Sequence, residues 1–280
     1  MKEQSFSFEF FPPKTEKGIA TLASVRETFA ALNPAFFSVT YGAGGSTQDT
    51  TINTVIDTQK VTGIPTASHL SCIGSSEEQI RDILNLYKEN GINRLVALRG
   101  DLPSGMRDIG DFQHANDLIA FIRKETGDYF QIEAAAYPEM HPQAPSFQKD
   151  IENFARKMNA GADRAITQYF FNPDAYFYFI DSVHEAGINK PILPGIMPIT
   201  NFVQLARFSD STGAGIPRWL RMRMESYGDD LESIQKLGLE FITQMCEKLL
   251  DGGAPGLHFY SMNRVEPSLS IWNDLKLSER

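Results

Sequence analysis

The chain has 280 residues, of which 42% are hydrophobic and 22% are charged, a composition typical of a folded globular protein. Its formal net charge of −9 disfavours a nucleic-acid surface, which needs a basic patch to neutralise phosphates. No apolar run approaches the roughly 20 residues of a membrane span, and the start MKEQSF lacks the apolar core of a secretion signal. We therefore expect a cytoplasmic protein with neither nucleic acid nor membrane as a partner.

The first strand is predicted in the stretch Ser5–Lys14, where Phe6, Phe8 and Phe10 alternate with small or polar residues. The two prolines that follow Phe11 end it. Further strands are predicted over residues 35–41, 66–72, 94–100, 131–137, 164–170, 191–197 and 257–262. Helices are predicted over residues 16–32, 46–60, 76–90, 115–125, 146–160, 173–186, 201–211, 217–226 and 229–250, with one more after the last strand.

Eight strands, each followed by helix, repeat at the roughly 30-residue spacing of a βα unit. This pattern predicts an α/β protein with a single (β/α)8 TIM barrel over residues 1–280. The alternative is an open doubly wound sheet, which would carry a Gly-x-Gly-x-x-Gly turn after the first strand. The chain has Phe11-Pro12-Pro13-Lys14 there instead, which favours the barrel. The two cysteines, Cys72 and Cys246, have neither disulfide nor ligand spacing, so we expect reduced thiols and no metal.

Polar side chains occupy the carboxyl ends of nearly all predicted strands, which is where a barrel of this kind has its active site. These residues are Glu9, Thr40, Tyr41, His69, Arg99, Asp101, Tyr137, His141, Gln168, Asn263 and Arg264. Their convergence predicts a catalytic site. Four of them also have a simpler interpretation: Glu9 as an edge-strand residue facing solvent, His69 as a core histidine bound to a carbonyl, and Arg99 with Asp101 as a rim ion pair.

Six motifs resemble those of bacterial-type methylenetetrahydrofolate reductases. They are FEFFPPK at 8–14, TYGAGGS at 40–46, RGD at 99–101, AYPE and HP within 136–142, ITQYF at 166–170 and PGIMP at 194–198. The resemblance extends in order over nearly the whole chain. It implies an FAD-dependent enzyme that reduces 5,10-methylenetetrahydrofolate to 5-methyltetrahydrofolate with NADH or NADPH, by ping-pong hydride transfer, in one-carbon metabolism and methionine synthesis. Because the chain stops soon after the eighth unit, the regulatory domain of eukaryotic members is not expected.

The resemblance also implies roles for individual residues. Glu9 looks like the general acid that protonates a folate nitrogen, and we expect desolvation to raise its pKa toward the working pH. Asp101 resembles the aspartate between flavin and folate, whose charge favours a cationic iminium. Phe208 is similar to an aromatic that stacks on nicotinamide and then on folate. The substrate contacts implied are Gln168, Gln204, Phe208 and Arg264.

The flavin contacts implied by the resemblance are Thr40, Tyr41, Ala43, His69, Arg99, Gly100, Asp101, Ala115, Tyr137, His141, Ala144, Asp150, Arg156 and Lys157. Arg156 and Lys157 would supply the local cations that an acidic protein needs to hold a pyrophosphate. Without the resemblance, this pair would be interpreted as part of a solvated helix face. The partners expected are the folate and the pyridine nucleotide, together with a second copy of the chain in a homo-oligomer.

Two other functions remain open at this point. A metal- or Schiff-base-dependent barrel lyase would use Glu9, Asp101 and His69, but no lysine ends a strand and no two histidines have ligand spacing. A non-enzymatic folate-binding or scaffold subunit would bind folate without turnover.

Overall fold

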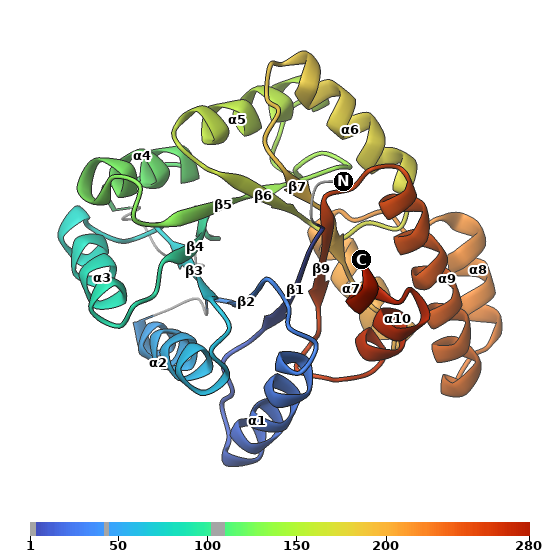
Figure 1. Ribbon diagram of the computed structural model, residues 1–280. Helices are drawn as coiled ribbons and strands as arrows, with labels where there is room; N and C mark the ends of the chain where they lie inside the picture. Colours follow the sequence, from blue (N-terminus) through green and yellow to red (C-terminus); the bar gives the residue numbers. More distant parts are fainter. Residues whose placement is uncertain (1–3, 42–44, 102–109) are drawn as a thin grey trace.

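The computed structural model describes residues 4–41, 45–101 and 110–280. These residues form one sheet of nine parallel strands with helices on its outer side, and the strands nearly close into a barrel (Figure 1). The sheet order is β7-β6-β5-β4-β3-β2-β1-β9-β8. The predicted (β/α)8 barrel is thus confirmed. Within the described residues, no helix has the length and apolar character needed to cross a membrane.

The strands are β1 (Ser5–Phe10), β2 (Phe36–Val39), β3 (Thr66–Ser71), β4 (Arg94–Leu98), β5 (Gln131–Ala136), β6 (Arg164–Thr167), β7 (Ile192–Leu193), β8 (Gly195–Ile196) and β9 (Gly256–Tyr260). The helices are α1 (Glu16–Ala30), α2 (Gly45–Thr62), α3 (Glu77–Glu89), α4 (Ala115–Thr126), α5 (Phe147–Asn159), α6 (Pro173–Glu185), α7 (Phe202–Thr212), α8 (Arg218–Ser226), α9 (Leu231–Asp251), α10 (Ser268–Asp274) and the 3-10 turn η1 (Leu277–Glu279). Most strands end earlier than predicted, because the chain leaves the sheet there to form the loops of the site.

The seventh predicted strand is divided at Pro194. β7 pairs with β6 and β8 pairs with β9, so this one segment joins the two ends of the sheet. Pro194 has no N–H to donate, although its carbonyl accepts a hydrogen bond from the backbone of His258 at 3.0 Å. A Cβ on the next residue, Gly195, would lie 2.2 Å from the carbonyl oxygen of Thr167 and 2.6 Å from the Tyr260 ring. Glycine is therefore required for this close approach.

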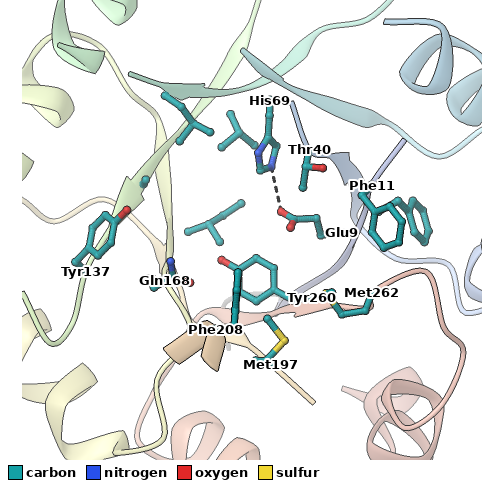
Figure 2. A pocket seen from close by; sticks show the side chains of 15 residues that line it. Glu9, Phe11, Thr40, His69, Tyr137, Gln168, Met197, Phe208, Tyr260 and Met262 are labelled. Atoms are coloured by element: carbon teal, nitrogen blue, oxygen red, sulfur yellow. Dashed lines mark ion pairs between the residues drawn. The ribbon is translucent and has the colours of Figure 1, made fainter. Parts of the chain in front are cut away.

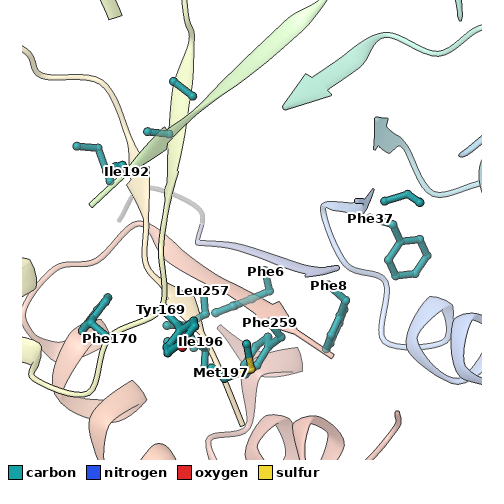
Figure 3. Packing of buried hydrophobic residues seen from close by; sticks show 14 of the residues in the cluster. Phe6, Phe8, Phe37, Tyr169, Phe170, Ile192, Ile196, Met197, Leu257 and Phe259 are labelled. Carbon is teal, nitrogen blue, oxygen red and sulfur yellow. The ribbon is translucent and has the colours of Figure 1, made fainter. Parts of the chain in front are cut away.

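The two faces of β1 have opposite chemistry. Phe6, Phe8 and Phe10 point outward and are buried, and Figure 3 shows Phe6 and Phe8 on the side of Phe259. The Phe8 ring stacks on Phe29 of α1 with 4.0 Å between ring centroids. The alternate residues of β1 face the inside of the barrel, so the predicted period of two is confirmed.

A small apolar layer crosses the barrel interior. It consists of Phe36, Ala67, Val96, Ile166 and Leu193, and it forms a cluster separate from the larger core between strands and helices. Layers of this kind fill the interior of such barrels. The site at the carboxyl ends of the strands therefore has a packed floor.

Charged residues lie inside the barrel on the amino-terminal side of this floor. Arg94 Nη1 is 3.3 Å from Oε1 of the fully buried Glu133, and Arg164 donates to Ser5 at 3.3 Å. The Arg94 guanidinium also lies 4.4 Å from the centroid of the Phe36 ring. Burial raises the pKa of Glu133 to about 7, although Arg94 and Arg164 act in the opposite direction. This carboxyl changes its charge near neutral pH.

The stacked pair of Phe8 and Phe29 tests how much the packing of α1 on β1 stabilises the barrel. Phe29→Ala should lower the free energy of unfolding by about 3–5 kcal/mol, because it leaves a cavity in a fully buried position. Ile19→Ala on the same helix is the control: Ile19 is 59% exposed, and its change should stay within about 0.5 kcal/mol. Urea unfolding followed by circular dichroism measures both, and equal effects would contradict this view of the core.

Candidate active site

A cavity of about 380 Å³ opens at the carboxyl ends of the strands (Figure 2). Six residues that the sequence predicts for the site line it, and they come from six different segments: Glu9 from β1, Thr40 after β2, His69 from β3, Tyr137 after β5, Gln168 after β6 and Phe208 from α7. Apolar side chains make up much of the remaining wall, among them Leu98, Met197 and the Tyr260 ring. A cavity with an apolar wall and a few converging polar groups is suited to a small organic molecule.

Glu9 lies in this cavity with only 14% of its side chain exposed. Its Oε2 atom is 3.0 Å from Nε2 of His69, the ion pair drawn in Figure 2, and 3.6 Å from Nε2 of His258. Ser38 donates a hydrogen bond to the same oxygen at 3.4 Å. Since β1 pairs with both β2 and β9, the interpretation of Glu9 as a solvent-facing edge residue is wrong.

The charge state of Glu9 differs from the prediction. Burial raises its pKa, but the nearby His69 and His258 lower it by more, so the pKa falls to about 2. The expected upward shift is therefore wrong, because the two imidazoles outweigh the loss of water. At neutral pH Glu9 is a carboxylate.

His69 faces the Glu9 carboxylate rather than a carbonyl group, so the interpretation as a core histidine bound to a carbonyl does not hold. Its Nε2 lies at ion-pair distance from Glu9 but is not aligned for a hydrogen bond with any described group. Within the described residues, no three His, Cys, Asp or Glu side chains form a group that could hold a metal ion.

Two more cavities continue the site outward over β4 and β5. The second, of about 220 Å³, shares Leu98, Ala135 and Tyr137 with the first. The third, of about 320 Å³, shares Arg99, Ala115, His141 and Lys157 with the second. Predicted flavin contacts line these outer cavities: Arg99, Gly100, Asp101, Ala115, Tyr137, His141, Ala144, Asp150, Arg156 and Lys157. One cleft, which we call the long cleft, thus leads from Glu9 to Arg156.

Arg99 and Gly100 lie at the middle of the long cleft. Arg99 donates to Gln143 Oε1 at 2.9 Å and to the Gly100 carbonyl at 3.2 Å. Among the residues described, no ion pair joins it to Asp101, so the alternative interpretation as a rim ion pair does not hold. Gly100 has φ +83°, and a Cβ there would lie 2.0 Å from Ser71 Oγ, so no other residue fits without rearrangement.

Cations gather at the outer end of the long cleft. Lys157 is partly buried and donates to the carbonyl of Ala135 at 2.5 Å. Burial lowers the pKa of Lys157 to about 8, although the charge of Asp150 opposes this shift. Arg156 is exposed and bonds Asn153 at 3.2 Å. Asp150 accepts the backbone N–H of His141 at 2.8 Å, which ties the loop after β5 to the start of α5.

Among the described residues, three predicted contacts do not line the long cleft, and a fourth is not described. Tyr41 is partly buried beside the mouth of the barrel, and Ala43 lies outside the described residues. Gln204 is exposed on α7 one helical turn before Phe208. Arg264 is exposed and lies 3.5 Å from Thr200.

Two residues of the site, His258 and its neighbour Ser7, were not predicted from the sequence. His258 is completely buried, and its Nδ1 is 2.7 Å from Ser7 Oγ. Strand alternation could have found both, because His258 lies on the same face of β9 as Tyr260, and Ser7 on the same face of β1 as Glu9. Apart from His69, the polar residues predicted for the site lie at or after the ends of the observed strands, whereas these two lie within β9 and β1.

Comparisons with known proteins place the chain in a family. Residues 1–276 match the family model described as methylenetetrahydrofolate reductase. The 5,10-methylenetetrahydrofolate reductase of Escherichia coli K12 is 41% identical over 269 residues, which cover 96% of this chain and 90% of that protein. Methylenetetrahydrofolate reductase (NADH) 1 of Arabidopsis thaliana is 38% identical over 98% of this chain and 49% of its own length.

A solved structure gives independent support for the fold. It is an uncharacterized protein from Clostridium thermocellum that binds two copies of 5-methyl-5,6,7,8-tetrahydrofolic acid. It superimposes with a TM-score of 0.69, covering 99% of this chain and 96% of its own, at 19% identity. By the match of its whole length to the family model and its identity to the bacterial enzymes, this chain belongs to the methylenetetrahydrofolate reductase family.

Proposed function

We propose that this protein reduces 5,10-methylenetetrahydrofolate to 5-methyltetrahydrofolate, with FAD as the hydride carrier and NADH or NADPH as the donor, the two substrates reacting in turn. The observation that carries the proposal is the position of Glu9, partly buried between two imidazoles in the inner cavity of a chain of this family. A general acid for the folate ring needs this kind of enclosed position.

The long cleft is suited to an elongated dianionic cofactor. Its inner part has apolar walls against which a flat ring system can pack, and its outer part carries Arg99, Arg156 and Lys157. These cations fit a pyrophosphate in a protein whose overall net charge is −9. When bound, FAD supplies the transfer of a hydride between two substrates that do not react with each other directly.

The inner cavity offers the groups that the folate needs. Gln168 has a side-chain amide that can pair with a pterin edge. Phe208 lines the cavity, is 48% exposed and stacks on Tyr169 with 5.7 Å between centroids, and a ring in this position is suited to pack against an aromatic substrate. Asp101, exposed at the rim, would favour the cationic form of the substrate.

Glu9 has to gain a proton before it can act as the acid. It rests as a carboxylate, and a folate that displaces water from the cavity raises its pKa because the charged form loses solvation. Protonated Glu9 then gives this proton to the folate nitrogen N10, and the bond between N10 and the methylene carbon breaks. The electron pair of N5 forms the iminium, whose carbon is the atom that accepts the hydride.

Two other functions have less support. For a metal-dependent lyase, the described residues offer no group of three ligands. A folate-binding protein without activity would not need an acid held between two imidazoles, and turnover distinguishes it from the enzyme.

The role of Glu9 can be tested by separating the two half-reactions. Glu9→Gln should still let NADH or NADPH bleach the flavin, but should slow its reoxidation by methylenetetrahydrofolate by about 100-fold or more, since the amide has no proton to give. Anaerobic stopped-flow absorbance measures both steps. Glu139→Gln is the control, because Glu139 binds the Gly215 N–H away from the inner cavity. A Glu9→Gln variant with full folate reduction would remove Glu9 from the reaction.

The charge of Glu9 can be tested through stability. Because its folded pKa of about 2 lies below the unfolded value of about 4.5, the carboxylate stabilises the fold above about pH 4.5, and this contribution is lost as the pH falls toward 2. Glu9→Gln should therefore lower the free energy of unfolding at pH 7 by up to about 3 kcal/mol, and by less at pH 3. Urea unfolding measures this difference. Glu27→Gln on the exposed side of α1 should show little effect at either pH.

The cationic end of the long cleft can be tested by flavin binding. Arg156→Ala should weaken FAD binding about tenfold, because it removes a charge-assisted contact to the pyrophosphate. Lys149→Ala is a matched control on the same helix, since Lys149 pairs with Glu152 and does not line the cleft. Fluorescence titration of the apoprotein with FAD gives both dissociation constants. Equal values for the two variants would refute the assigned site.

A further inference from the structure

His258 lies directly beneath Glu9 and has no contact with solvent. It pairs with Ser7 across β1 and β9, so the register of these two strands sets its position. Its Nδ1 is 2.7 Å from Ser7 Oγ, while its Nε2 is 3.4 Å from Ser38 Oγ and 3.6 Å from Oε2 of Glu9. Both nitrogens of a fully buried imidazole thus have defined neighbours.

These contacts determine which nitrogen carries the proton. A carboxylate can only accept hydrogen bonds, so Oε2 of Glu9 requires donors around it. Ser38 gives its hydroxyl proton to Oε2, which leaves its oxygen to accept from Nε2 of His258. Nε2 therefore carries the hydrogen, and the lone pair of Nδ1 accepts the Ser7 hydroxyl. A donating Ser7 hydroxyl at Nδ1 holds this tautomer, in which Nε2 carries its hydrogen toward Ser38 and lies 3.6 Å from Oε2 of Glu9.

The other groups around His258 do not change this arrangement. The Phe36 ring stacks on the imidazole at 5.8 Å, and the Tyr260 ring meets it edge-on at 5.4 Å. His69 contacts the same oxygen of Glu9 at 3.0 Å, and Arg94 lies over the Phe36 ring rather than against His258. Burial lowers the pKa of His258, although Glu9 opposes this shift, so the imidazole is neutral. It acts on Glu9 as an oriented N–H.

The polar contacts that the structure gives the Glu9 side chain all go to Oε2, and within the described residues Oε1 has no polar partner. The cavity wall includes Glu9, so Oε1 is the oxygen available to a bound molecule. An acid anchored through one oxygen presents the other in a fixed direction.

We propose that His258, held in its Nε2–H tautomer by Ser7, is a positioning residue that anchors Oε2 of Glu9, leaves Oε1 to carry the proton for the folate, and sets the acid strength of Glu9. This inference rests on the proposed function for its catalytic part. The folate nitrogen to be protonated is weakly basic, because its lone pair is conjugated with an aromatic ring. A buried N–H that stabilises the carboxylate left after transfer makes Glu9 a stronger acid for this step.

The first experiment measures the protonation of Glu9 without turnover. The infrared band of its protonated carboxyl is assigned by its loss in Glu9→Gln and is then followed against pH in the purified protein. His258→Leu removes the N–H donor, and Ser7→Ala removes the hydroxyl that holds His258 in the Nε2–H tautomer. Both variants should therefore raise the midpoint of the Glu9 titration by about one to two pH units. His258→Gln keeps an N–H near the place of Nε2 and should restore most of the original value.

The second experiment follows the two half-reactions of the same variants. His258→Leu and Ser7→Ala should slow the folate step about tenfold and leave flavin reduction by the pyridine nucleotide within about twofold. Ser68→Ala is the matched control, because it removes a buried serine hydroxyl from strand β3. This hydroxyl lies 2.6 Å from the Tyr87 hydroxyl and does not contact Glu9.

An unchanged Glu9 titration in both His258→Leu and Ser7→Ala would overturn the proposal. Equal shifts in His258→Leu and His258→Gln would also overturn it, because they would mean that the imidazole only fills space. If His258→Leu fails to fold, Ser7→Ala decides alone, since it removes a single oxygen. A wild-type protein that never reduces folate would overturn the proposed function, and the infrared titration would still decide whether His258 positions Glu9.

Discussion

Parallel pairing of β1 with both β2 and β9 is the constraint on which the rest of the barrel depends. It closes the sheet around the first strand, so every second residue of β1 lies inside the barrel and the residues between them pack against helices. Phe8 stabilises the outer packing, while Ser7 and Glu9 form a polar column inside. One strand therefore supplies both the core contacts that hold α1 and the carboxylate at the centre of the site.

Much of this arrangement could be predicted from the sequence, because strand alternation and helix caps are local signals. The barrel, the order of its elements and the gathering of Glu9, His69 and Gln168 follow from them. The division of the seventh strand at Pro194 is also a local effect, but it becomes visible only once its two partners are known.

The charge of Glu9 could not be predicted in the same way. The direction of its pKa shift depends on whether burial or the neighbouring imidazoles dominate. Those imidazoles belong to His69, which is 60 residues away, and to His258, near the other end of the chain. A pattern that shows an acid among aromatic residues indicates desolvation only. The contacts across the closed barrel reverse the expected shift, and they also explain why Glu9 presents one oxygen to the cavity.

The interior of the barrel holds a second carboxylate whose surroundings have the opposite effect. Glu133, below the apolar floor, has a pKa raised to about 7, whereas that of Glu9 is lowered to about 2. By proton linkage, Glu133 favours the fold most at pH values below its unfolded pKa, and this contribution is lost as the pH rises through about 7. Below the floor the carboxyl therefore favours the fold at low pH, whereas the carboxylate above the floor favours it at higher pH, because their neighbours differ.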